Sequence, residues 1–246
     1  MYLLDKVQYD EKQDRLIFTG DLVDRGPASG EVVRWVREMF YRTNGLTTSV
    51  LGNHDEKLFR WYKHALKKRE NPNYRIPMRP LSTDKMISYN ALSEEDLQFL
   101  GELPIYAHLQ GPDWVVVHAG LEPGKPLEEQ SAGKVTHIRF LSPDSKKTVS
   151  LGENFEQPAG TIYWTDCYDL PHHVVYGHNI HSMAQPYVVT KPHGPQLVGL
   201  DTGCCFGGSL SAFIVPSTKE EPVTPDNFFS VQAIKAYSRS AINTKD

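Results

Sequence analysis

The chain has 246 residues, of which 39% are hydrophobic and 23% charged, and its formal net charge is −4. No apolar run approaches the roughly 18 residues of a membrane span, and residues 1–6 carry no apolar leader, so we expect a cytoplasmic protein that does not enter a membrane. The negative charge offers nucleic acid no long-range attraction, and three cysteines without a CxxC pair argue against a disulfide framework.

Four short apolar runs predict buried strands, because each ends at glycine and polar residues. They cover residues 16–18, 49–51, 115–117 and 174–176. Helical patterns follow the first two runs, over residues 32–40 and 58–66. This order of strand, polar turn, helix and strand is typical of a βαβ unit, in which ligands bind beyond the carboxyl ends of the strands.

The rest of the chain gives weaker patterns. Residues 71–84 contain three prolines and predict an extended loop, and Ser93 predicts the start of a further helix. Residues 122–160 predict an irregular insertion that shapes a substrate cleft. The last segments are a strand over 210–215, a polar linker over 216–227, and a strand or docked helix over 228–237.

The first polar turn, GDLVDRG, carries two carboxylates and a guanidinium, from Asp21, Asp24 and Arg25. Carboxylates bind hard divalent cations, and an arginine fork binds phosphate oxygens. The turn can therefore supply both parts of a metal-assisted phosphoryl site. The alternative is a helix start at which Asp24 caps the backbone and Arg25 forms a surface ion pair.

Further donors follow the other strands. Asn53, His54 and Asp55 follow the second strand, and His118 and His178 follow the third and fourth. Taken singly, each of these residues also suits a turn or a hydrogen-bonded core position. Together, the carboxylate of the first turn, the amide and the two imidazoles at strand ends form a plausible ligand set for Mn, Fe or Zn.

The motifs GDLVDRG, GNHD, HAGL and YGH occur in this order, and GLDTGCCFGGSLSA follows at residues 199–212. This order resembles the phosphoprotein-phosphatase family of calcineurin-like metallophosphoesterases, and the last segment is most similar to diadenosine tetraphosphatases of the bacterial, ApaH-like type. The resemblance implies an α/β (α+β) fold, a four-layer sandwich of two mixed β-sheets flanked by helices. It places this domain over residues 1–215 and leaves 216–246 as a polar extension.

The resemblance also implies residue roles. Two divalent ions (Mn, Fe or Zn) would be bound, and the ligands in this chain would be Asp21, Asn53, His118 and His178. A metal-activated water would attack phosphorus, His54 would protonate the leaving oxygen, and Asp24 would hold that imidazole. Arg25 would bind the phosphoryl oxygens. Arg139 is either a second phosphate clamp or an ordinary surface arginine.

One motif of the family is missing. Members open with a strand that ends in GDxHG, whose Asp and His bind the first metal, whereas the twenty residues before Asp21 contain no histidine. Either the recorded start lies too late, or the chain has lost the first strand and the first metal site. In the second case it would bind one ion rather than two, with low or absent activity.

Three functions are therefore open. The chain hydrolyses phosphoanhydrides such as dinucleoside polyphosphates; or it is a phosphatase of the same family that acts on polyphosphate, an RNA end or a phosphoserine/threonine protein; or it is an inactive phosphate-binding or regulatory module. Its expected partner is thus a phosphorylated small molecule, nucleotide or phosphoprotein, with no membrane and no specific nucleic acid. The metal-contacting residues do not distinguish these substrates.

Overall fold

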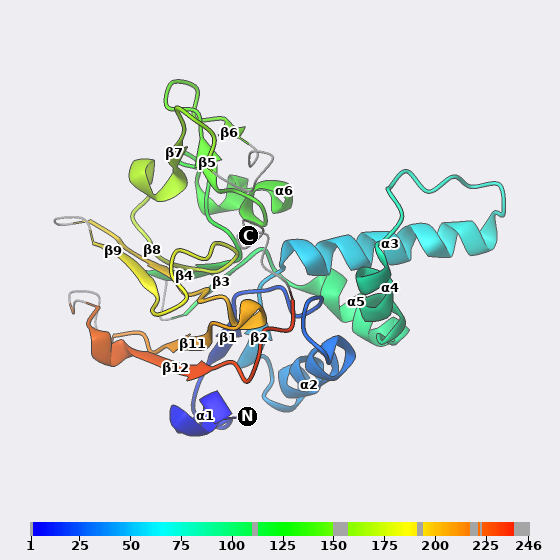
Figure 1. Ribbon diagram of the computed structural model, residues 1–246, viewed down its shortest axis with the longest axis horizontal. Coiled ribbons are helices and arrows are strands. Elements are labelled where there is room, and N and C mark those ends of the chain that lie inside the picture. The colour runs from blue at the N-terminus through cyan, green and yellow to red at the C-terminus, as the bar shows by residue number, and fades with distance from the viewer. Residues whose placement is uncertain are drawn as a thin grey trace.

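The computed structural model describes residues 2–109, 113–149, 157–190, 194–216, 221 and 223–238. Most of the described helical residues lie in the N-terminal half of the chain (Figure 1). The helices are α1 (Tyr2–Lys6), α2 (Ser29–Arg42), α3 (Asn53–Glu70), α4 (Thr83–Asn90), α5 (Glu94–Glu102) and α6 (Ala132–Val135).

A five-stranded sheet forms the centre of the fold. Its strands are β3 (Tyr106–His108), β4 (Trp114–Val117), β8 (His173–Tyr176), β10 (Gln196–Gly199) and β9 (Tyr187–Thr190), in this spatial order. β4, β8 and β10 are parallel to one another, whereas β3 and β9 pair antiparallel at the two edges. Every residue of the three parallel strands is buried, as expected for a sheet that is covered on both faces.

The two faces of this sheet pack against different layers. Val115 and Val117 of β4 belong to a core that includes Leu141 of the insertion. Val116, which points to the opposite face, packs in a core with Ile17 and Phe213. Ile17 belongs to β1 (Leu16–Phe18), and Phe213 to β11 (Ser209–Phe213), which pairs antiparallel with β12 (Phe228–Gln232). The central sheet thus lies between the insertion and a second layer of strands.

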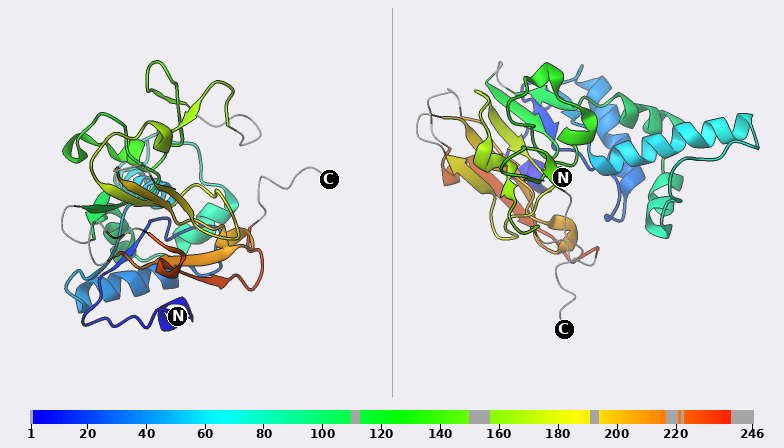
Figure 2. Two further views of the ribbon diagram at one scale, coloured as in Figure 1. Left: turned by 90° about the vertical axis from the view of Figure 1, so that its left-hand side faces the viewer. Right: turned by 90° about the horizontal axis from the view of Figure 1, so that it is seen from above.

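The helices α2 to α5 gather on one side of the strands (Figure 1). α2 connects β1 to the parallel strand β2 (Thr47–Ser49), which is the βαβ unit predicted from the sequence. Val33, Leu58 and Leu100 are fully buried in the core that α2, α3 and α5 share. Beyond this core, α3 extends away from the sheets, as the view from above also shows (Figure 2).

The main predicted elements are confirmed. β1 matches its predicted run, β4 and β8 each begin one residue before theirs, and β2 begins and ends two residues before its run. Helices α2 and α3 are longer than their patterns at both ends. Ser93 caps α5: its Oγ accepts a hydrogen bond from Asp96 N at 3.1 Å, and Asp96 Oδ2 accepts one from Ser93 N at 3.0 Å. The prediction of an α/β fold with mixed sheets and flanking helices is confirmed, although the described strands form four hydrogen-bonded sheets rather than two.

Two segments differ from the prediction. The insertion over 122–160 is not wholly irregular, because it holds α6 and the strands β5 (Phe140–Leu141) and β6 (Thr148–Val149), which pair in a small sheet with β7 (Ile162–Tyr163). Strands of two residues are too short to leave a periodic pattern. Similarly, the loop predicted over 71–84 ends at Ser82, and α4 begins at Thr83. Residues 150–156 of the insertion lie outside the described residues.

The C-terminal part returns to the fold. β12 lies in the segment predicted as a polar extension, and it pairs with β11 along its whole length. Of the predicted linker over 216–227, residues 217–220 and 222 lie outside the described residues. Among the helices that the structure describes, none is long and apolar enough to cross a membrane.

Candidate metal centre and phosphate site

The predicted ligands lie at the ends of two pairs of parallel strands. β4 and β8 end in register; His118 follows β4 directly, and His178 follows β8 after one glycine. β1 and β2 also end in register; Asp21 lies on the turn after β1, and Asn53 is the first residue of α3, which follows the turn after β2. Because parallel strands end at the same edge, residues far apart in sequence meet there.

Two glycines let the Asp21 and Asn53 turns pack directly against each other. A Cβ atom on Gly52 would lie 2.2 Å from the backbone nitrogen of Asp21, and one on Gly20 would lie 2.8 Å from the nitrogen of Gly52. The buried carboxylate of Asp55 joins the turns, since its Oδ2 accepts hydrogen bonds from Asp21 N at 2.8 Å and Gly52 N at 3.0 Å. Burial, and then the charge of Asp21, raise the pKa of Asp55.

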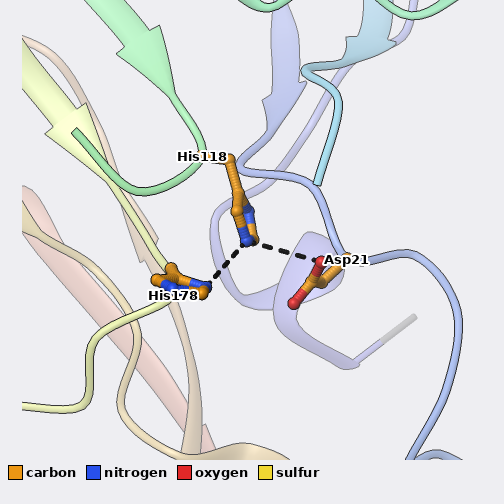
Figure 3. A group of neighbouring side chains, drawn as sticks. All are labelled: Asp21, His118 and His178. Atoms are coloured by element: carbon orange, nitrogen blue, oxygen red, sulfur yellow. Dashed lines mark hydrogen bonds and ion pairs between the residues drawn. The ribbon is translucent and has the colours of Figure 1, made fainter. Parts of the chain in front are cut away.

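Asp21, His118 and His178 form a compact group (Figure 3), in which one ligand atom from each lies within 4.8 Å of the others. Nε2 of His118 lies at its centre, 3.4 Å from Asp21 Oδ1 and 3.1 Å from His178 Nδ1. Asn53 completes the group, because its Oδ1 lies 3.0 Å from the same Nε2. All four predicted ligands are therefore neighbours.

The chemistry of this group fits a bound cation. Nδ1 of His118 lies 2.7 Å from the carbonyl oxygen of Thr19, which can only accept, so Nδ1 carries the proton. Nε2 is then a lone-pair donor that faces two oxygen atoms, from Asp21 and Asn53. A hydrogen bond that fixes the outer nitrogen of a ligating histidine is typical of metal sites.

His178 is also suited to ligation. Burial, together with electrostatic repulsion from the neighbouring His118 and Arg139 side chains, lowers the pKa of His178 well below its ordinary value, so its imidazole is neutral. Neutral imidazole is the form that binds metal ions. The described residues of the group thus offer one carboxylate, one amide and two imidazoles, a set that suits Mn, Fe or Zn.

His54 and Asp24 form a hydrogen-bonded pair beside this group. His54 Nδ1 lies 2.6 Å from Asp24 Oδ2, and the other ring nitrogen, Nε2, lies 4.0 Å from Asp21 Oδ2. Lys85 of α4 binds the same oxygen of Asp24. Although burial opposes ionisation, the hydrogen bonds from His54 and Lys85 hold the pKa of Asp24 well below its ordinary value. Asp24 is therefore a carboxylate that can orient His54.

Two arginines lie near the group. The guanidinium of Arg25 lies over the ring of Phe206, 5.3 Å from its centroid. Arg139 is partly buried and donates a hydrogen bond to Asn179, which in turn donates to the hydroxyl of Tyr163 at 2.6 Å. Burial lowers the pKa of Arg139, but an arginine stays charged in proteins. Arg139 is thus partly buried and not an ordinary exposed arginine. Its positive charge helps to lower the pKa of His178.

Backbone strain concentrates at this site. In the described part of the chain, seven non-glycine residues have a positive φ, and four of them are predicted site residues: Asp21 at 56°, Asp24 at 71°, Arg25 at 61° and His178 at 65°. A left-handed conformation is uncommon for residues other than glycine; Asp and His adopt it more readily than most, whereas it is costly for a bulky residue such as arginine. Such strain persists where the surrounding structure holds it, and it often marks functional sites.

Sequence reasoning missed three residues of the site. Lys85 lies in no motif, since it belongs to a helix that the pattern did not predict. Asn179 directly follows the YGH motif, so its position was a usable signal. Asp55 was part of the GNHD motif, but its role in joining two turns depends on contacts with Asp21, which is distant in sequence.

The chain is similar to several known proteins. Residues 1–199 match the family described as calcineurin-like phosphoesterase. The asymmetrical bis(5'-nucleosyl)-tetraphosphatase PrpE of Bacillus subtilis is 31% identical, over 82% of this chain and 75% of that protein. The symmetrical bis(5'-nucleosyl)-tetraphosphatase of Janthinobacterium is 30% identical, over 85% of each.

A solved structure is similar as well. The crystal structure of a protein provisionally identified as a diadenosine tetraphosphatase superposes with a TM-score of 0.68 at 26% identity. The match covers 94% of this chain and 86% of the other. The likeness therefore extends over nearly the whole chain.

Proposed function

The chain belongs to the calcineurin-like phosphoesterase family, whose members are metal-dependent hydrolases, and we propose that it cleaves a phosphoanhydride bond of dinucleoside polyphosphates. The observation that carries the proposal is the position of His118 Nε2, which faces Asp21 Oδ1 at 3.4 Å beside the hydrogen-bonded pair of His54 and Asp24. A cation site next to a candidate proton donor is the arrangement that phosphoryl transfer requires.

In this proposal, Asp21, Asn53, His118 and His178 hold the metal. A divalent cation bound there, with Mn, Fe or Zn as candidates, would stabilise charge on the phosphoryl oxygens and acidify a water molecule. Asp21 also accepts a hydrogen bond from His54 N at 3.0 Å, which fixes its carboxylate relative to the next turn.

The other polar residues act on the phosphate and the leaving group. His54 protonates the leaving oxygen through Nε2, because Asp24 holds its Nδ1 at 2.6 Å. Arg25 and Arg139 bind the oxygens of the transferred phosphoryl group, as guanidinium forks do. Asn179 orients Arg139 and keeps it from turning away.

The relatives that are named tetraphosphatases support a nucleotide substrate, and they include both symmetrical and asymmetrical enzymes. Cleavage in the middle of diadenosine tetraphosphate gives two molecules of ADP, whereas cleavage at one end gives AMP and ATP. A phosphoprotein or polyphosphate substrate is the alternative within the family, and a cytoplasmic location remains a prediction.

The test uses the full chain with Mn²⁺ and diadenosine tetraphosphate, with products separated by ion-exchange chromatography. We expect nucleotide products that disappear with EDTA and in His54→Ala, whereas His64→Ala, on the distant part of α3, keeps them. Preference for a phosphopeptide or for polyphosphate would overturn the proposal that dinucleoside polyphosphates are the substrates. Metal binding without turnover of any substrate would favour the inactive phosphate-binding module.

A further inference from the structure

Lys85 is a cation that the proposed mechanism does not use. It belongs to α4 and forms an ion pair with Asp24, and its Nζ also lies 2.9 Å from His54 Nδ1. The Asp24 side chain is 5% exposed, whereas that of Lys85 is 20% exposed. Lys85 is therefore the more exposed member of the pair.

The hydrogen bonds leave Lys85 with donors to spare. Its ammonium group has three hydrogens, and the bond to Asp24 Oδ2 uses one of them. That oxygen is shared with His54, whereas Asp24 Oδ1 is buried without a hydrogen-bond partner. Because His54 Nδ1 also donates to Asp24, it offers no acceptor to Lys85. Among the residues that the structure describes, the bond to Asp24 thus leaves two hydrogens of the ammonium group for a further acceptor such as an anion.

The helix that carries Lys85, α4, is tightly packed against its neighbours. The helix packs closely on α2, since a Cβ atom on Gly30 would lie 2.2 Å from the carbonyl oxygen of Ala91, at the end of α4. Ser29 accepts a hydrogen bond from Asp24 N at 3.1 Å and contacts Ser88 of α4 at 3.4 Å. The lysine, the carboxylate and the helix thus form one connected unit.

There is also room beside this unit. A cavity of about 270 Å³ lies between residues 26–31 and α4, and Ser29, Arg34 and Ser88 contribute to its lining. The cavity lies on the same helix as Lys85, on the side of the Asp24 turn. Lys85 itself is not among the lining residues, so the cavity shows space near α4 and not a direct contact with the lysine.

We propose that Lys85 is a specificity-determining residue that binds a phosphate of the leaving group and so makes the site prefer anhydrides to simple monoesters. The inference rests on the proposed function, in which His54 protonates the leaving oxygen. The leaving group of an anhydride carries negative charge next to that oxygen, whereas that of a monoester carries none there. Both leaving oxygens gain negative charge as the bond breaks, but only the anhydride adds the charge of a neighbouring phosphate, so a cation beside His54 stabilises its departure more strongly.

The experiment compares diadenosine tetraphosphate with 4-nitrophenyl phosphate, whose leaving groups are of similar acidity and place a similar demand on His54. The variants are Lys85→Met, Lys85→Arg and the control Lys67→Met, which removes an exposed charge from the distant end of α3. The measured quantity is the ratio of kcat/KM for the anhydride to that for the monoester. In Lys85→Met we expect this ratio to fall about 10-fold or more, with recovery in Lys85→Arg and no change in the control.

An equal loss on both substrates would overturn the proposal, because it would make Lys85 a positioning residue for Asp24. A binding measurement keeps the test independent of turnover. By calorimetry with Mn²⁺ present, Lys85→Met should weaken binding of a methylene-bridged dinucleotide tetraphosphate more than binding of phenylphosphonate. Equal affinities in the wild type and Lys85→Met would also overturn it. Absence of turnover in the wild type would count against the proposed function, and the binding result would still decide the role of Lys85.

Discussion

Nδ1 of His118 donates a hydrogen bond to the carbonyl oxygen of Thr19 over 2.7 Å, and this bond joins the end of β4 to the end of β1. The two strands belong to different sheets, so the bond fixes the position of Nε2 relative to Asp21 across two layers. The metal centre that we propose depends on this link between layers.

Replacing His118 with alanine should remove a ligand and the link to Thr19 together. We expect the affinity for Mn²⁺ or Zn²⁺ to fall by about 100-fold or more, because loss even of an outer partner of a ligand typically costs about 10–100-fold. Equilibrium dialysis of the folded variant measures this. His64→Ala is the control, since His64 lies on α3 and its side chain bonds the hydroxyl of Tyr74 in the loop that follows. Similar metal affinities in both variants would contradict the assignment of His118 as a ligand.

The packing of the two turns predicts a strong effect at Gly52. In Gly52→Ala the new methyl group would lie 2.3 Å from Asp21 Oδ1, so the turns must separate. We expect a loss of about 2–4 kcal/mol in the free energy of unfolding and loss of metal binding. Gly133→Ala is the matched control: nothing lies within 4 Å of its added Cβ in helix α6, so its stability should be unchanged or higher. Retained metal binding in Gly52→Ala would show that the close packing of Gly52 on Asp21 does not position the metal ligands.

The ion pairs of Asp24 predict a pH-dependent stability difference between the wild type and Asp24→Asn. The folded pKa of Asp24 lies well below the ordinary value of 3.8, so its stabilising charge is present above that value and is lost as the pH falls through the folded pKa. Urea unfolding in EDTA should show a deficit of about 2–3 kcal/mol for Asp24→Asn near pH 7. The deficit should shrink below about pH 4. A stability difference between the two proteins that grows as the pH falls would contradict this role of the Asp24 charge.

Arg139 predicts a defect in phosphate recognition. Arg139→Met should raise the inhibition constant of inorganic phosphate about 10-fold, because a partly buried guanidinium is lost from the phosphate site. Asn179→Ala should give a smaller change in the same direction, since it only frees Arg139 to move. Arg69→Met serves as the control, because Arg69 forms an exposed pair with Glu94. An unchanged inhibition constant in Arg139→Met would mean that phosphate binds without contact to Arg139.

The sequence by itself determined the local elements and the candidate ligands. Apolar runs bounded by glycine predicted β1, β4 and β8. A short buried strand has an apolar composition that is visible in the local sequence, whatever strand it pairs with. The ordered motifs likewise predicted Asp21, Asn53, His118 and His178 as a set. The short strands β5 and β6 left no pattern, and neither did α4, whose eight residues expose Ile87 and bury only Ser88.

Only the tertiary structure decided how these residues act on one another. The choice of proton position on His118 depends on Thr19, 99 positions away in the chain, and the ion pair of Asp24 depends on Lys85, 61 positions away. Contacts of this kind arise from strand register and helix packing, which combine distant segments. A sequence pattern records the period of one element, and it holds no information on which side chain of another element will face it.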